Sequence, residues 1–170
     1  MKKTFAKMRQ RGYGLIEVIL AIAITLGLIV GGIVLFNQSQ LASNTTDASR
    51  AIVSISSESR ALYRTAPDFS NLTGAELMEA GAVAANLIVG EEGSEAIILP
   101  YEGTVTVGPN ATEPREFDVS VAWDATNDNA RALCTRLAAE VSPGGVGPLG
   151  TGYTATNDCV NGNLTATFTR

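Results

Sequence analysis

One long apolar run dominates the N-terminal part of the chain. Between Val18 and Phe36 no residue is charged, and Thr25 is the only polar side chain. A helix over residues 13–36 is about 36 Å long, which is enough to cross the hydrocarbon core of a bilayer. One acid, Glu17, lies near the start of the run, and a carboxylate in hydrocarbon is unfavourable unless it is paired or hydrated.

A second pattern begins where the first ends. Apolar and small residues recur at alternating steps of four and three, which predicts one stripe along a helix whose other faces are polar. Neither proline nor glycine interrupts residues 33–66, and Pro67 ends the pattern. The sequence therefore predicts a single helix of about fifty residues, apolar on all sides to residue 36 and amphipathic over residues 37–66. The stripe consists of Leu41, Thr45, Ala48, Ile52, Ile55, Ser59 and Leu62.

Beyond Pro67 the chain consists of shorter segments. A cap-like serine or asparagine followed by residues 72–78 predicts a short helix. Residues 126–141 predict another helix, capped by Asn127 or Asp128, with a glycine-rich loop after it. Runs of alternating or β-branched residues predict strands. These runs cover residues 95–101, 103–108, 116–123 and 163–170.

The segments beyond the long helix predict an α+β globular domain over residues 67–170. Alternation in the third strand puts Phe117, Val119, Val121 and Trp123 on one face. A mainly antiparallel sheet with such a face offers the long helix a surface on which to bury its stripe. We expect the N-terminal helix to pack on this sheet.

Two cysteines, Cys134 and Cys159, stand 25 residues apart, and the chain has no histidine. A metal site needs three or four ligands, and neither cysteine has a neighbouring ligand residue. The pair therefore predicts a disulfide formed outside the cytoplasm, with two unrelated buried thiols as the alternative. No nucleophile–base pair or phosphate-binding loop is present, so neither an enzyme nor a cofactor is expected.

Charge is divided unevenly along the chain. Residues 1–12 hold five of the 12 basic side chains and no acid, whereas the remainder holds 7 arginines against 17 acids, a formal net charge of −10. The positive-inside rule puts the basic stretch in the cytoplasm and the remainder outside. A secretory signal peptide is also basic and then apolar, but only a weak cleavage site follows the apolar run, at residues 41–43. The acidic remainder argues against nucleic acid as a ligand.

The stretch "RGYGLIEVILAIAITLG" resembles the cleavage site and N-terminal helix of a type IV prepilin. The basic leader ends at Gly12, and Glu17 is the fifth residue after it. The resemblance implies cleavage between Gly12 and Tyr13 by a prepilin peptidase of the inner membrane, followed by N-methylation of Tyr13. Phe or Met is usual at that position, so Tyr13 departs from the family pattern while remaining aromatic.

Later segments resemble the type IVb subclass, which includes toxin-coregulated and thin conjugative pili. The leader of 12 residues is longer than is typical of type IVa. "LTGAELMEAGAV" is similar to the short helical segment that follows the long helix in type IVb pilins. "FDVSVAWDATNDNARALCTRLAAE" is similar to their central strand and to the helix that bears the first cysteine of a disulfide-bounded region, here residues 134–159.

The resemblance implies a structural role, most specifically that of the major pilin. Residues 13–36 would anchor the subunit in the inner membrane, with its C-terminal domain periplasmic, until an assembly platform and its ATPase system extract it. The subunits would then form a helical homopolymer outside the cell, used for adhesion, aggregation or conjugation. Glu17 would pair with the N-terminal amine of the neighbouring subunit and set the register, because an unpaired buried charge is unfavourable.

Three glycines in the apolar half have two interpretations. Gly27, Gly31 and Gly32 either let the helix loosen inside a filament, since glycine weakens helices, or let helices pack closely.

Other functions remain alternatives. One is a pseudopilin of a type II secretion system, although the cysteine pair weighs against it. Another is a minor pilin. A third is a single-pass inner-membrane protein with a periplasmic ligand-binding domain, which would keep residues 1–12 and have no need of Glu17.

Overall fold

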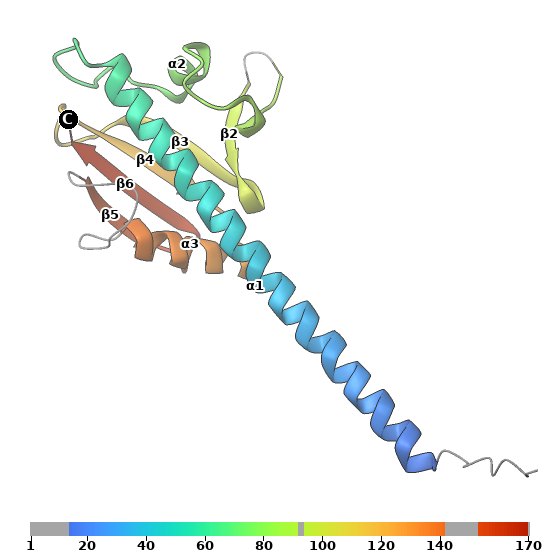
Figure 1. Ribbon diagram of the computed structural model, residues 1–170. Coiled ribbons are helices and arrows are strands. Elements are labelled where there is room, and N and C mark those ends of the chain that lie inside the picture. The colour runs from blue at the N-terminus through green and yellow to red at the C-terminus, as the bar shows by residue number, and fades with distance from the viewer. Residues whose placement is uncertain (1–13, 92–93, 142–152, 170) are drawn as a thin grey trace, which may run out of the picture. The chain divides into compact units, whose positions relative to one another are not determined.

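One helix, α1 (Leu15–Leu62), runs through two units of the chain (Figure 1). The computed structural model describes residues 14–91, 94–141 and 153–169. The first unit ends at Ser39, and the second begins at Gln40 and contains the other described elements. In chain order these are α2 (Gly74–Glu79), η1 (Ala85–Leu87), β1 (Ile88–Val89), β2 (Ala96–Leu99), η2 (Pro100–Glu102), β3 (Gly103–Pro109), β4 (Glu116–Ala122), α3 (Asp128–Val141), β5 (Tyr153–Asp158) and β6 (Asn163–Thr169).

The predicted stripe is the face that the second half of α1 buries. Its inner residues are buried, Leu41 is half-buried, and Leu62 at the end of the helix is exposed. The hydroxyl of Thr45 donates a hydrogen bond of 2.7 Å to the carbonyl oxygen of Leu41, one turn back. The Ser59 hydroxyl donates in the same way to the carbonyl oxygen of Ile55. Burying these two hydroxyls therefore costs little free energy, because each has a hydrogen-bond acceptor one turn back. The inner residues are Thr45, Ala48, Ile52, Ile55 and Ser59.

The helix ends at Leu62, four residues earlier than the sequence pattern predicts. The N–H of Arg64 donates to Ala61 and that of Ala66 to Tyr63, which are the tighter bonds of turns. The Tyr63 ring packs on the Phe69 ring, with centroids 5.6 Å apart. The chain therefore turns before Pro67, because the Tyr63 side chain packs in the core.

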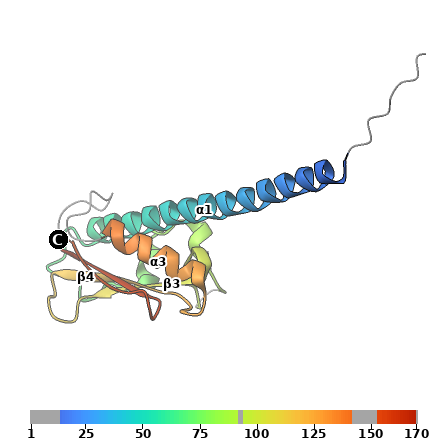
Figure 2. The same ribbon diagram turned by 90° about the horizontal axis from the view of Figure 1, so that it is seen from below.

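A six-stranded antiparallel sheet forms the base of the second unit. Its strand order is β1-β2-β3-β4-β6-β5, so β6 lies between β4 and β5. The second half of α1 and α3 lie on one side of the sheet (Figure 2). The fold is thus α+β with a long N-terminal helix on an antiparallel sheet, as the sequence predicts.

The face of the sheet beneath the helices is apolar because the strands alternate. Phe117, Val119, Val121 and Trp123 are all buried, as predicted. Phe117 is paired in register with Phe168 on β6. The aromatic rings form a continuous row, with 4.8 Å between the centroids of Phe69 and Phe117 and 5.3 Å between those of Phe117 and Phe168.

Trp123 is held at the end of β4 by close backbone contacts. Its indole N–H donates to the carbonyl oxygen of Pro100, at 3.1 Å. A Cβ at Gly103 would lie 2.2 Å from the indole nitrogen, and one at Gly162 would lie 2.3 Å from the Trp123 carbonyl oxygen. Glycine at both positions is therefore a condition for burying this side chain.

Helix α3 begins where the sequence predicts. The side-chain oxygen of Asn127 accepts hydrogen bonds from the backbone N–H groups of Asn129 and Ala130, at 3.0 and 3.3 Å. Such caps satisfy donors that the first turn leaves without partners. The inner face of α3 buries Leu133 and Leu137.

Candidate assembly site and disulfide region

Within the first unit, residues 18–36 of α1 present an apolar surface on all sides. Every residue from Gly14 to Ser39 is exposed, including the hydroxyl-bearing Thr25, which donates to the carbonyl oxygen of Ala21. Among large hydrophobic residues that the structure describes as exposed, all but Leu62, Val89 and Val160 lie between residues 15 and 36. The described chain contains one helix that is long and apolar enough to cross a membrane, and it is α1.

Glu17 lies in the first turn of α1. Its backbone N–H donates to the carbonyl oxygen of Gly14 at 2.8 Å, and the carboxylate stands near the positive end of the helix dipole. The predicted cleavage site at Gly12 and Tyr13 lies outside the described residues. The pairing of Glu17 with the amine of another subunit stays a prediction.

Gly27, Gly31 and Gly32 lie within continuous helix. A Cβ placed at any of them meets no atom within 4 Å in the described part of this single chain. Gly27 and Gly31 are one turn apart, which puts them on one face with the spacing that permits close helix packing. Loosening of the helix inside a filament stays a prediction.

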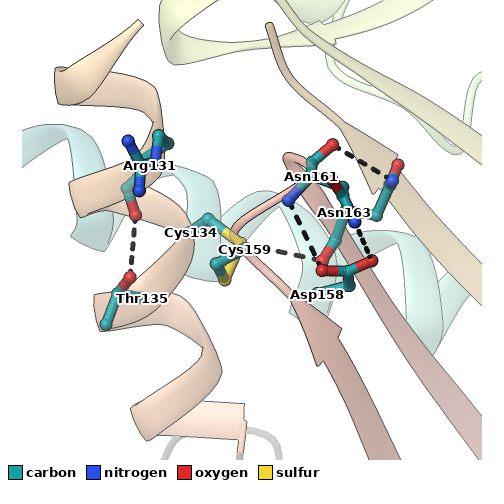
Figure 3. The surroundings of a disulfide bond; sticks show 7 residues. All are labelled: Arg131, Cys134, Thr135, Asp158, Cys159, Asn161 and Asn163. Atoms are coloured by element: carbon teal, nitrogen blue, oxygen red, sulfur yellow. Dashed lines mark hydrogen bonds between the residues drawn. A yellow bond between two sulfur atoms is a disulfide. The ribbon is translucent and has the colours of Figure 1, made fainter. Parts of the chain in front are cut away.

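The predicted disulfide joins Cys134 on α3 to Cys159, which follows β5 (Figure 3). The two Cα atoms are 5.6 Å apart. Cys134 is fully buried, whereas Cys159 is half-buried. Next to Cys159, the Asp158 carboxylate accepts a 2.8 Å hydrogen bond from the side chain of Asn161, which shapes the β5–β6 turn. The bond fastens α3 to the edge of the sheet that β5 forms.

Replacing either cysteine by serine is expected to lower the free energy of unfolding of the second unit by about 3.5 kcal/mol, the chain-entropy value for a loop of this length. Cys134→Ser should cost more than Cys159→Ser, because it puts a hydroxyl at a fully buried position. Urea unfolding of the full chain in detergent micelles, followed by the fluorescence of the single tryptophan, measures both. Thr135→Ala, at the exposed neighbour of Cys134, is the control. Equal midpoints for wild type and both serine variants would contradict a stabilising role.

The sequence did not indicate the contacts that connect the end of α1 to the rest of the unit. The Tyr63 hydroxyl donates to the carboxylate of Glu76 on α2. Burial of Tyr63, together with this hydrogen bond and the negative charge of Glu76, raises the pKa of the tyrosine to about 12. The Arg60 guanidinium lies 5.7 Å from the centre of the Phe168 ring, a cation–π distance.

The surface of the second unit has several hollows among the described residues. One of about 580 Å³ lies between α1, the segment 82–89 and β2. Another, of about 400 Å³, is lined by Glu113, Arg115, Glu116 and Thr169, and one of about 300 Å³ lies beside the disulfide. In the described ranges, no three His, Cys, Asp or Glu side chains gather closely enough to hold a metal ion.

Comparison with protein-family models, with curated proteins and with solved structures finds no match to this chain.

Proposed function

We propose that this chain is a structural subunit, the major pilin, of a type IVb pilus. The observation that carries the proposal is the composition of α1. The helix is unbroken. Its residues 18–36 are apolar and exposed on every side, whereas the stripe on its second half is buried in a disulfide-linked domain. An apolar surface of this extent needs a cover, which a bilayer supplies before assembly and other copies of the helix supply afterwards.

The lone acid separates this function from that of a plain membrane anchor. An anchor has no use for Glu17, which is costly in hydrocarbon. In a bundle of identical helices the carboxylate can accept the N-terminal amine of a neighbouring copy. An apolar bundle slips easily along its axis, and one buried ionic contact fixes its register. The pair Gly27 and Gly31 supports close approach of helices in the same bundle.

The globular unit suits a filament exposed outside the cell. Its disulfide persists in oxidising surroundings, and its acidic composition favours solubility over binding to nucleic acid. We place the subunit in the inner membrane before assembly and in the extracellular pilus afterwards. A prepilin peptidase and an assembly platform with its ATPase system are its partners.

Mass spectrometry of the N-terminal peptide, from sheared surface material and from membranes, tests the proposal. We expect a chain that starts at methylated Tyr13 in the sheared fraction. A processed chain confined to membranes would favour a pseudopilin or a minor pilin. A chain that still carries residues 1–12 would favour the single-pass membrane protein.

A further inference from the structure

The turn between β5 and β6, residues 159–162, contains the single asparagine–glycine pair of the chain, Asn161 and Gly162 (Figure 3). In such a pair the backbone nitrogen of the glycine can attack the side-chain amide carbon of the asparagine, because glycine has no side chain to block the approach. Every other asparagine precedes a residue that has a side chain. Asn161 is also exposed, so water reaches its amide.

Hydrogen bonds hold Asn161 by both its side chain and its backbone. The side-chain amide donates to the Asp158 carboxylate at 2.8 Å, and the backbone N–H donates to the Asp158 carbonyl oxygen at 3.0 Å. The carbonyl oxygen of Asn161 accepts a 3.2 Å hydrogen bond from the side chain of Asn163. Attack by Gly162 rotates the Asn161 side chain and turns its amide nitrogen into a leaving group, so the reaction costs the hydrogen bond to Asp158.

The backbone of Gly162 is held in place as well. Gly162 is buried, and its φ of +76° is a conformation that suits glycine. Its carbonyl oxygen accepts a 2.8 Å hydrogen bond from the backbone N–H of Trp123. The space beside it is filled, because a Cβ would lie 2.3 Å from the Trp123 carbonyl oxygen. The attacking nitrogen therefore has little freedom to approach the amide while the turn is closed.

The disulfide fixes the other end of the turn. Cys159 is the first residue of the turn, and the bond ties it to the buried Cys134 of α3. Without this bond the turn is held by hydrogen bonds of exposed side chains and by the contact between Gly162 and Trp123. Local opening of such a surface turn requires much less free energy than unfolding of a domain. We therefore expect the turn to open more often once the disulfide is reduced.

The reaction in an open turn needs only water. A bond forms between the Gly162 nitrogen and the side-chain carbon of Asn161, the bond from that carbon to the amide nitrogen breaks, and ammonia leaves with the proton of the Gly162 N–H. Water then opens the cyclic imide. Opening at the former side-chain carbon gives aspartate, whereas opening at the backbone carbonyl gives isoaspartate, in which the main chain runs through the former side chain.

Neither product fits the closed turn. Aspartate at residue 161 is an acceptor only, so the hydrogen bond to Asp158 is replaced by repulsion between two carboxylates. Isoaspartate lengthens the main chain by one carbon just before Gly162, where there is no space even for a Cβ. In both cases the turn loses the contacts that closed it.

We propose that Asn161 is a site of non-enzymatic deamidation, that the closed, disulfide-linked turn protects it, and that its reaction in an open turn prevents the turn from closing again. The modified residue is then a permanent record that the disulfide has been lost. The inference goes beyond the proposed function and does not depend on it, because every contact that carries it lies within the second unit of one chain.

Mass spectrometry of the full chain in detergent micelles, incubated in mildly alkaline buffer with or without dithiothreitol, tests the protection. Trypsin releases residues 137–170 as one peptide, and fragment ions show which of Asn157, Asn161 and Asn163 has changed from amide to acid. We expect Asn161 to react at least about tenfold faster in the reduced chain, and the other two to react much less in both buffers. Equal rates in both buffers, or no reaction at Asn161 in either, would overturn the proposal.

Asp158→Ala separates opening of the turn from unfolding of the whole unit, because it removes the acceptor of the Asn161 amide and leaves the disulfide intact. Asp158 is exposed, and Trp123 fluorescence reports that the variant is folded. Its Asn161 is expected to react about threefold faster or more in the absence of reductant. Asp128→Ala removes another exposed acid beside the disulfide and should react as the wild type does. Equal rates for the two variants would contradict protection by the turn.

Asn161→Asp introduces one product directly and tests whether it keeps the turn open. We expect a lower urea midpoint, followed by Trp123 fluorescence, and slower re-formation of the disulfide after reduction. Asn157→Asp adds the same charge at an exposed residue of β5 and is the matched control. Midpoints and reoxidation rates that are equal in the two variants would overturn the claim that the product prevents closure.

Discussion

Replacing Phe117 by alanine is expected to lower the free energy of unfolding of the second unit by about 4 kcal/mol, a value within the usual range for a buried phenylalanine. Phe117 is completely buried between Phe69 and Phe168 in the row of aromatic rings, so its removal takes away two ring contacts and leaves a cavity. Domains are generally stable by only about 5–15 kcal/mol, so the loss is a large share of the total.

Tryptophan fluorescence of the full chain in detergent micelles, recorded against urea, measures this loss. Trp123 is 5% exposed on the same face of the sheet, so it reports unfolding of the core directly. Phe36→Ala is the matched control, because it makes the same truncation at an exposed residue of the first unit. A midpoint for Phe117→Ala equal to that of Phe36→Ala would contradict the assignment of Phe117 to the centre of the core.

The local sequence patterns predicted the fold best. The stripe on α1, the alternation in β4 and the cap of α3 all depend on residues close together in sequence, and all three are present. Two short strands were missed. β1 has only two residues, and β5 is rich in polar residues and threonine, so each is a strand because a neighbouring strand pairs with it. The predicted glycine-rich loop lies outside the described residues.

The end of α1 shows a second limit of local patterns. Pro67 marks the last residue at which the helix must stop, but the actual end at Leu62 depends on Tyr63 packing against Phe69 and donating a hydrogen bond to Glu76. These partners come from later segments, and only the folded chain brings them to Tyr63.

The candidate site, too, could be predicted from the sequence only in part. Glu17 is visible in the sequence because a single acid interrupts an apolar run, and the two cysteines are visible because there are only two. The hollow between α1, the segment 82–89 and β2 combines residues from three separate segments, and Val89 and Val160 differ from buried valines only in where the fold puts them. No sequence pattern signals such surfaces.

Replacing Glu17 by glutamine is expected to abolish surface fibres while leaving the subunit processed and in the membrane. In the proposed filament the amine of Tyr13 is buried against the carboxylate of a neighbouring copy. Glutamine keeps the shape but removes the charge, which leaves the amine without a counter-ion. Breaking a buried ion pair in this way costs about 3 kcal/mol or more, or at least about a hundredfold in the association constant of each subunit. A polymer repeats that loss at every contact, so assembly should fall below detection.

The control for this variant is Glu58→Gln, which neutralises another acid of the same helix at an exposed position outside the apolar run. Immunoblots of sheared and membrane fractions, with mass spectrometry of the N-terminal peptide, separate failure of assembly from failure of processing. We expect Glu17→Gln subunits to start at Tyr13, to accumulate in membranes and to be absent from the sheared fraction, whereas Glu58→Gln subunits form fibres as the wild type does. Wild-type amounts of fibre from Glu17→Gln would show that the register of the bundle depends on apolar packing alone, since glutamine preserves that packing and removes only the charge.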